Sequence, residues 1–257
     1  MVLQFYKYQG TGNDFVMIDN RQGFFPKSDI TLITKLCDRR FGIGGDGLIL
    51  LENDLASDFK MEYFNSDGSQ SMCGNGGRCA VAFANYLGII DGETTFNAID
   101  GLHYATLEGD IVNLKMSDVS EIKEKSAYSF LDTGSPHHVQ LVGNLGGLDV
   151  KTEGAKLRYG LYGKSGSNIN FVEQSHGDTF NVRTYERGVE DETLSCGTGV
   201  TAVAIAMHKE GKTTSKNVKI NAVGGDLTIS FEQQNGTYTN IFLKGPAKQV
   251  YKGEIEC

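Results

Sequence analysis

Two stretches of the sequence, Cys73-Gly74-Asn75-Gly76 and Cys196-Gly197-Thr198-Gly199, lie 123 residues apart and have nearly the same pattern. Each leads into an almost wholly apolar segment, residues 79–87 in the first copy and residues 200–207 in the second. A helix that is apolar on nearly every face has to be buried on nearly every face. The two stretches therefore predict two central buried helices, one in each half of the chain.

A cysteine stands at the start of each expected helix, and a glycine, Gly88 or Gly211, follows 15 residues after that cysteine and marks the helix end. Unpaired backbone N–H groups and the positive end of the helix dipole gather at a helix N-terminus. This setting lowers the pKa of a thiol and also binds carboxylates. Two such cysteines acting on one substrate would form a two-thiol acid–base pair.

The repeat extends beyond the helices, because residues 97–101 (NAIDG) are echoed by residues 221–225 (NAVGG), and strand-like segments follow both. Short strands, residues 58–65 and 180–186, are expected before the helices. A repeat of this length indicates a duplicated domain. We expect an α+β fold of two domains, each a curled sheet around its helix: residues 1–117 with a return strand at residues 246–257, and residues 118–245.

The composition bounds the class of protein. A formal charge of −8 over 257 residues argues against a nucleic-acid-binding surface. No apolar run approaches the roughly 18 residues of a membrane span, and no secretion signal is seen at the N-terminus. The five cysteines are an odd number at no metal-ligand spacing. We therefore expect a reduced cytoplasmic protein without a metal site, a nucleic-acid partner or a membrane partner.

Seven segments are spread over nearly the whole chain: residues 10–16, 40–47, 64–69, 73–79, 134–137, 168–172 and 183–199. Taken in this order, they resemble the diaminopimelate epimerase family. Two positions depart from the family pattern. Gly47 stands where some members carry Gln, and Ser135 stands where many carry Asn.

The resemblance implies two pseudosymmetric domains with the active site in the cleft between them. It implies the interconversion of LL- and meso-2,6-diaminopimelate, on the route to lysine and peptidoglycan precursors, without pyridoxal phosphate or another cofactor. A homodimer is the expected assembly. Inverting a carbon without an imine cofactor needs two opposed acid–base groups, and a thiol suits this task because its pKa can be brought near the operating pH.

The resemblance assigns the catalytic acid–base roles to Cys73 and Cys196, and it gives His137 and Glu186 the roles of holding the reacting ammonium group and tuning the charge of the site. Arg187 offers a planar fork for the distal carboxylate. The expected substrate-binding residues are Asn13, Asn65, Gly74, Asn75, Ser135, Asn168, Glu186, Arg187, Gly197 and Thr198.

Two other functions stay open from the residues alone. One is a different isomerase on the same scaffold, such as a proline racemase or a phenazine-biosynthesis-like isomerase. The other is a redox role in which the two cysteines form a switchable disulfide. Cys37, Cys79 and Cys257 lack the helix-start setting and are expected to be structural. The acidic run at residues 190–192 is expected to be a solvated face.

Overall fold

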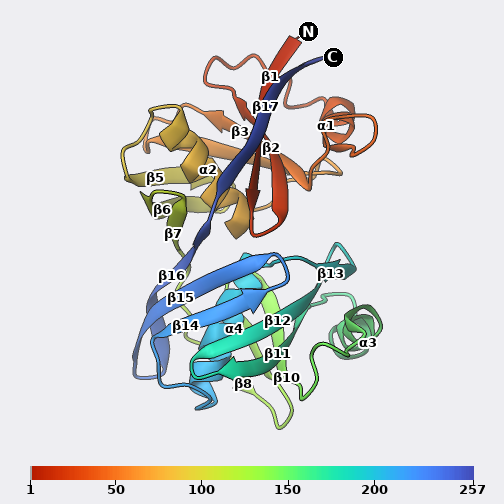
Figure 1. The fold of residues 1–257 in the computed structure, drawn as a ribbon, viewed down its shortest axis with the longest axis vertical. Coiled ribbons are helices and arrows are strands. Elements are labelled where there is room, and N and C mark those ends of the chain that lie inside the picture. Colours follow the sequence, from red (N-terminus) through yellow and green to blue (C-terminus); the bar gives the residue numbers. More distant parts are fainter. Residues whose placement is uncertain (1) are drawn as a thin grey trace. The chain divides into compact units, whose positions relative to one another are not determined.

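The computed structural model describes residues 2–257, and the chain divides into two compact units. The first unit comprises Met1–Leu114 and Gly245–Cys257, and the second comprises Lys115–Lys244. Each unit combines a curled β-sheet with helices (Figure 1). The mixed α+β fold with a repeated architecture, expected from the sequence, is therefore confirmed.

The first unit contains helices α1 (Ile30–Cys37) and α2 (Gly74–Tyr86). Its strands are β1 (Val2–Gly10), β2 (Asn13–Asp19), β3 (Gly47–Glu52), β4 (Phe59–Asn65), β5 (Glu93–Ala98), β6 (Gly101–Glu108), β7 (Ile111–Lys115) and β17 (Lys248–Glu256).

The second unit contains helices α3 (Val150–Tyr162) and α4 (Gly197–Lys209). Its strands are β8 (Ile122–Glu124), β9 (Ser129–Asp132), β10 (Pro136–Leu141), β11 (Asn168–His176), β12 (Thr179–Glu186), β13 (Asp191–Thr193), β14 (Asn217–Ala222), β15 (Gly225–Gln234) and β16 (Thr237–Pro246).

Strand pairing repeats between the units. In the first, β2 pairs parallel with β3, β3 antiparallel with β4, and β4 parallel with β5. In the second, β10, β11, β12 and β14 repeat these three pairings in the same order. A hairpin follows in each unit, β5–β6 and β14–β15. Strands β2, β3 and β4 therefore correspond to β10, β11 and β12, which gives residue-by-residue equivalences between the two units.

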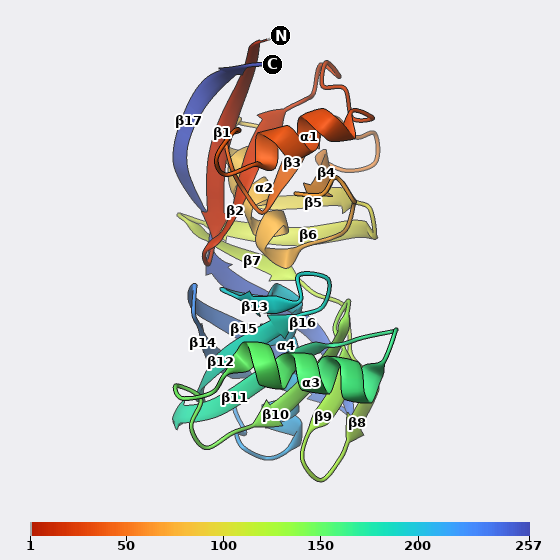
Figure 2. The ribbon, with the colours of Figure 1, turned by 90° about the vertical axis from the view of Figure 1, so that its right-hand side faces the viewer.

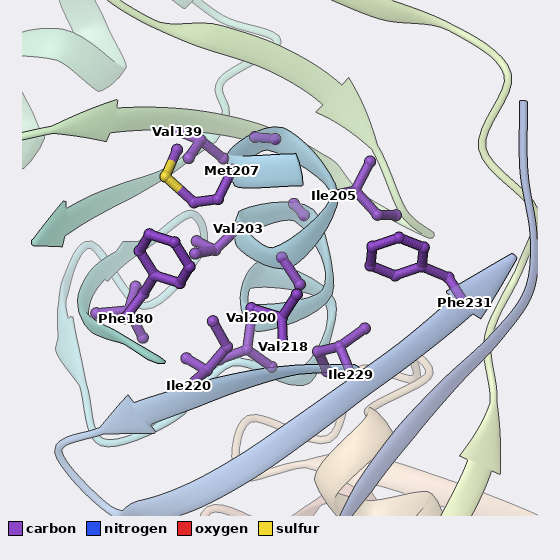
Figure 3. Close-up of a cluster of buried hydrophobic side chains, with 14 of the residues drawn as sticks. Val139, Phe180, Val200, Val203, Ile205, Met207, Val218, Ile220, Ile229 and Phe231 are labelled. Carbon is purple, nitrogen blue, oxygen red and sulfur yellow. The ribbon is translucent and has the colours of Figure 1, made fainter. Parts of the chain in front are cut away.

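The helices α2 and α4 are the two central buried helices that the sequence predicts. Residues 79–81 of α2 and residues 199–207 of α4 are all buried. Figure 3 shows α4 enclosed by apolar side chains of the surrounding strands, Val139, Phe180, Val218, Ile220, Ile229 and Phe231 among them. Gly88 and Gly211 follow the two helices in the left-handed conformation, at φ of 69° in both cases, so the glycine stop signals are confirmed.

A second helix in each unit, α1 or α3, was not expected from the sequence. Both begin at an aspartate whose side chain accepts a backbone N–H of the first turn, Asp29 from Leu32 and Asp149 from Thr152. Figure 2 shows each of them lying across the strands of its own unit.

Strands β3 and β11 each run between two helices, so both of their faces are covered. Leu48 and Leu50 share a buried cluster with α1 residues, whereas Ile49 faces α2. In the other unit, Ile169 and Phe171 pack with α3 residues. Since side chains alternate along a strand, Asn168 and Asn170 face the α4 side.

The two ends of the chain lie side by side in the first unit (Figure 1). Strand β17 pairs antiparallel with β1, with Val2 opposite Glu256 and Phe5 opposite Gly253. This pairing carries the chain back to its starting sheet after β16. No helix within residues 2–257 is long and apolar enough to cross a lipid bilayer.

Candidate active site

Cys73 and Cys196 are the N-cap residues of α2 and α4. Their backbones are extended, with φ and ψ of −134° and 120° at Cys73 and of −119° and 112° at Cys196. The carbonyl of each accepts the first helical hydrogen bond, at 2.8 Å from Gly77 and at 2.9 Å from Val200. Each thiol therefore sits beside the positive end of a helix dipole, which favours negative charge on sulfur or on a bound carboxylate.

In the first unit, Cys73 faces the side-chain oxygen of Asn13, with Sγ 3.4 Å from Oδ1. The same oxygen accepts from the side-chain nitrogen of Asn75 at 3.3 Å. The amide nitrogen of Asn13 donates to the Asp46 carboxylate, which fixes the orientation of the amide. Three expected site residues, Asn13, Cys73 and Asn75, therefore lie together at the start of α2.

A cluster of ion pairs holds the loop that carries Asn13. Arg39 bridges Asp14 and Asp46 at 2.6 Å and 2.7 Å, and Lys7 reaches Asp14 at 2.8 Å. Burial raises the pKa of Asp14, but hydrogen bonds from Arg39 and Lys7 outweigh it and lower that pKa to about 2. Asp14 is therefore charged at neutral pH and stabilises this loop against the sheet.

Arg78 is fully buried in α2, one turn after Cys73. Its guanidinium donates to the Asn75 side chain at 3.0 Å and to the Thr11 hydroxyl at 3.1 Å, while its Nε has no hydrogen-bond partner among the described residues. Burial lowers the pKa of Arg78. Its bond to Asn75 turns the amide nitrogen of Asn75 toward Asn13, so Arg78 supports the contacts around Cys73. Sequence reasoning missed this role, because a single arginine in a helix gives no sign of being buried.

In the second unit, Cys196 lies 3.5 Å from the hydroxyl of Thr198, measured from Sγ to Oγ1. That hydroxyl is 2.9 Å from Nε2 of His137, which also lies 3.2 Å from the hydroxyl of Ser135. Ser135 in turn accepts from the Asn168 amide at 2.7 Å. Five expected site residues thus form one hydrogen-bonded network at the N-terminal end of α4.

His137 has no exposed surface, and both of its ring nitrogens are engaged, Nδ1 with Asn170 and Nε2 with Thr198. Burial, with a further contribution from the positive charge of Arg187, lowers the pKa of His137 to about 3. The imidazole is therefore neutral at physiological pH.

Glu186 ends strand β12 and Arg187 follows it, both close to the same network. Glu186 accepts from the Thr193 hydroxyl at 2.8 Å, and the backbone N–H of Arg187 donates to the Asn168 side-chain oxygen at 2.9 Å. The Arg187 side chain is exposed and donates to the Ser165 carbonyl at 3.1 Å. Asn168 therefore links the strand end that carries Arg187 to Ser135.

Asn65 lies in a different local network of the first unit. Its side-chain nitrogen contacts the Ser69 carbonyl and the hydroxyls of Ser69 and Ser71, at 3.0–3.2 Å. These bonds close the loop that leads to Cys73. The expected role of Asn65 in substrate binding stays a prediction.

The two departures from the family pattern have different structural surroundings. A Cβ built at Gly47 would lie 2.4 Å from the Tyr63 ring and 2.4 Å from the Phe64 carbonyl, so there is no room for a glutamine in this conformation. Ser135, in contrast, makes polar contacts with His137 and Asn168. The Tyr63 ring fills the space at Gly47.

The acidic run at residues 190–192 is not simply a solvated face. Each carboxylate pairs with a cation of the same unit, Glu190 with Arg158, Asp191 with Lys151 and Glu192 with Arg183. These pairs hold β13 and the preceding turn against α3 and β12.

The remaining cysteines have other settings. Burial raises the pKa of Cys37 to about 11 and that of Cys79 to about 12, so both stay protonated at neutral pH. Cys257 lies at the chain end and is partly buried.

The sequence profile of the diaminopimelate epimerase family matches residues 5–116 and 129–250. A diaminopimelate epimerase from Flavobacterium psychrophilum is 64% identical over 256 residues, covering 98% of this chain and 100% of the relative. A diaminopimelate epimerase from Chlorobaculum tepidum is 45% identical, covering 96% of this chain and 98% of the relative.

Solved structures share the fold at low sequence identity. A phenazine biosynthesis protein of the PhzF family from Bacillus anthracis superposes with a TM-score of 0.80 at 13% identity, covering 100% of both chains. A hydroxyproline epimerase from Agrobacterium vitis gives a TM-score of 0.71 at 15% identity, covering 99% of this chain and 92% of the other. The full-length sequence matches, together with the two N-capping cysteines, place the chain in the diaminopimelate epimerase family.

Proposed function

We propose that this protein interconverts LL- and meso-2,6-diaminopimelate by proton transfer between two cysteines, in the biosynthesis of lysine and peptidoglycan precursors. The observation that carries the proposal is the matched placement of Cys73 and Cys196, each the N-cap of the central helix of its unit. The full-length identity to curated diaminopimelate epimerases supports the choice of substrate.

The reaction requires one thiolate to remove the α-proton from one face of the carbon and one thiol to deliver a proton to the other face. We propose that Cys73 and Cys196 fill these roles and exchange them in the reverse direction. The α-proton of an amino acid is very weakly acidic, so electrostatic stabilisation has to supply much of the rate. Backbone N–H groups of Gly74, Asn75, Gly197 and Thr198, at the two helix N-termini, are suited to hold the reacting carboxylate.

The two groups expected at the reacting ammonium have different environments. Glu186 is partly exposed, and its carboxylate is suited to pair with the ammonium. His137 is fully buried and neutral, and its Nε2 is engaged by Thr198. We therefore propose that His137 acts on the site through Thr198 rather than by touching the substrate.

We propose that the distal end of the substrate is recognised by Arg187, with Asn13, Asn65, Ser135 and Asn168 supplying further hydrogen bonds. The exposed guanidinium of Arg187 can pair with a carboxylate through two parallel hydrogen bonds. Its backbone is fixed by Asn168, which favours a constant position of the fork. Recognition of a second charged end explains how one centre is inverted while the other is left unchanged.

We further propose that the protein acts in the cytoplasm as a homodimer. Acid–base chemistry by Cys73 and Cys196 requires that both stay reduced, and this requirement supports the proposed location. The dimer rests on the family resemblance and can be tested by sedimentation equilibrium.

The function is tested by incubating the protein with LL-diaminopimelate in deuterated water. We expect formation of the meso isomer with deuterium at the inverted α-carbon, because the thiol that reprotonates this carbon has exchanged its hydrogen for deuterium from the solvent. Recovery of unlabelled LL isomer would exclude the proposed activity. Proline, offered as the alternative substrate in a parallel reaction, is expected to gain no deuterium.

A further inference from the structure

The buried side chain of Asn170 lies behind the network of Cys196. Its amide nitrogen donates to the carbonyl of His138 at 2.9 Å and lies 3.1 Å from Nδ1 of His137. Its oxygen accepts from the Thr184 hydroxyl at 3.0 Å. Since a carbonyl can only accept, the amide nitrogen has to face His138, and the orientation of the Asn170 side chain is therefore fixed.

The fixed amide determines which nitrogen of His137 carries the proton. An NH2 group can only donate, so Nδ1 of His137 accepts and the ring proton lies on Nε2. Of the two hydroxyls near Nε2, that of Thr198 is the nearer at 2.9 Å, against 3.2 Å for Ser135, so the ring proton is directed to Thr198. With its oxygen accepting from His137, Thr198 can direct its own hydrogen toward Sγ of Cys196 at 3.5 Å. Each residue then donates to the next in one direction: Asn170 to His137, His137 to Thr198, and Thr198 to Cys196.

The first unit has the same strand pairing but carries apolar residues at the positions of His137 and Asn170, so the fold itself does not require polar groups there. The strand register pairs His137 with Asn168 in one unit and Phe15 with Gly47 in the other, so Phe15 corresponds to His137. Two residues further along the neighbouring strand, Ile49 corresponds to Asn170. Phe15 and Ile49 are fully buried, as are His137 and Asn170. Burying polar groups costs free energy that apolar residues avoid, so their presence in one unit calls for a role in the chemistry.

Gly199 gives independent support for a close approach between Asn170 and the cysteine. A Cβ at this position would lie 2.6 Å from Oδ1 of Asn170 and 3.4 Å from Sγ of Cys196. The absence of a side chain in the third residue after Cys196 therefore lets Asn170 pack directly beneath the start of α4.

We propose that Asn170 is a positioning residue that holds His137 as the Nε2–H tautomer, so that Thr198 donates to Cys196 and stabilises it as the thiolate in the free enzyme. This inference rests on the proposed function of Cys196 as an acid–base group. His137 stays neutral throughout the physiological range, in keeping with its lowered pKa. The group that faces Cys196 in this series of hydrogen bonds is therefore the neutral, dipolar hydroxyl of Thr198, and no net charge is added beside the thiol.

Charged and titratable residues also lie around the series of hydrogen bonds from Asn170 to Cys196. Arg187 lies close enough to lower the pKa of His137, and Glu186 on the same strand end accepts from Thr193. His138, the next residue along β10, bonds to Tyr162 and Gln140, away from Cys196.

The tautomer is tested in the unaltered protein by ¹⁵N NMR of labelled histidine at neutral pH. We expect His137 to show a protonated Nε2 and an unprotonated Nδ1. A proton on Nδ1, or a charged ring, would overturn the proposal without any variant being made.

The effect on Cys196 is tested with Asn170→Leu, which keeps the branching of the side chain at Cγ and places an apolar side chain where the other unit has Ile49. Iodoacetamide alkylation is followed by peptide mass spectrometry across pH, with Cys73 as the internal reference. We expect Cys196 to react about tenfold more slowly at neutral pH in Asn170→Leu, with its reaction profile moved to higher pH by about one unit. Cys73 should keep its wild-type profile.

The matched control is Thr184→Val, which removes the other hydrogen bond of the Asn170 side chain but leaves its amide nitrogen bound to His138. This variant should be less stable than wild type yet keep the Cys196 profile and the His137 tautomer. An unchanged Cys196 profile in a folded Asn170→Leu protein would contradict the proposal. Because these readouts need no substrate, they stand or fall separately from epimerisation of diaminopimelate.

Discussion

Ile49 of β3 and Asn170 of β11 occupy equivalent positions in the two units, and each faces the glycine that lies three residues after an N-capping cysteine. A Cβ on Gly76 would lie 3.2 Å from Cδ1 of Ile49, whereas a Cβ on Gly199 would lie 2.6 Å from Oδ1 of Asn170. One copy of the repeat thus has an apolar contact beneath its cysteine and the other a polar one. The duplicated fold has been used for two chemically different thiol environments.

This difference predicts unequal responses to alanine at the two glycines. In Gly76→Ala, the flexible ends of Ile49 and Met61 can move by a few tenths of an ångström, and alanine also favours the helix. We expect its unfolding free energy to stay within about 1 kcal/mol of wild type.

Gly199→Ala should be the more damaging change, because the new methyl group would displace the Asn170 side chain. We expect a destabilisation of about 1–3 kcal/mol and a loss of kcat/KM for LL-diaminopimelate larger than that of Gly76→Ala. Urea unfolding and steady-state kinetics on both variants check this. Equal effects at the two positions would argue against a special role for the contact between Gly199 and Asn170.

Replacing His137 by phenylalanine, the residue at the equivalent position of the other unit, should change the pH dependence of stability. Burial lowers the pKa of His137 to about 3 in the folded protein, from 6.5 for a free side chain. Below pH 6.5 the unfolded chain therefore binds a proton that the folded protein does not, so the stability of the wild-type protein falls as the pH drops toward 3.

His137→Phe lacks this proton uptake. As the pH falls from about 6 to about 4, the unfolding free energy of the variant relative to wild type should rise by at most about 1.4 kcal/mol per pH unit. The epimerase activity of the variant should be lost. Urea unfolding of both proteins at several pH values measures the difference. Parallel stability curves would show that His137 is not held neutral by burial.

Arg187→Lys should reduce kcat/KM for diaminopimelate sharply, because lysine keeps the charge but loses the planar fork. The expected loss corresponds to a few kcal/mol, as for a bidentate pair with a carboxylate. Remote binding energy also aligns the reacting centre, so kcat is expected to fall as well as KM to rise.

The control for Arg187 is a monocarboxylate amino acid, which lacks the distal group and should be a poor substrate of both proteins. Its small kcat/KM should change little in Arg187→Lys. Proportionate losses for the two substrates would mean that Arg187 acts on the fold or on the thiols, and its role in distal recognition would be withdrawn.

The repeated architecture could be predicted from the sequence because its signals are local. A cysteine, a glycine-rich turn, an apolar segment and a closing glycine recur in both halves, and strands β4 and β12 follow the expected residues 58–65 and 180–186 closely. The helices α1 and α3 were missed. The first is only 8 residues long, and the second contains Gly154 and Gly160, which disfavour a helix.

The candidate cysteines could also be identified from the sequence, but the residues that support them could not. An asparagine in a strand, such as Asn170, gives no local sign that it faces a helix start. Its place follows from the register of β10 with β11 and from the packing of α4 on the sheet. The same holds for Arg78 and Asp46, whose roles depend on contacts between residues far apart in the chain.

The central claim, that two thiols carry the proton transfer, is tested most directly by measuring epimerisation of LL-diaminopimelate by Cys73→Ala and Cys196→Ala, with Cys257→Ala as a control cysteine outside both helix starts. Each of the first two variants should fold and lose about 10³-fold or more in kcat, as for deletion of a positioned acid–base group. Cys257→Ala should retain wild-type turnover. Near wild-type turnover in either Cys73→Ala or Cys196→Ala would contradict the two-thiol mechanism.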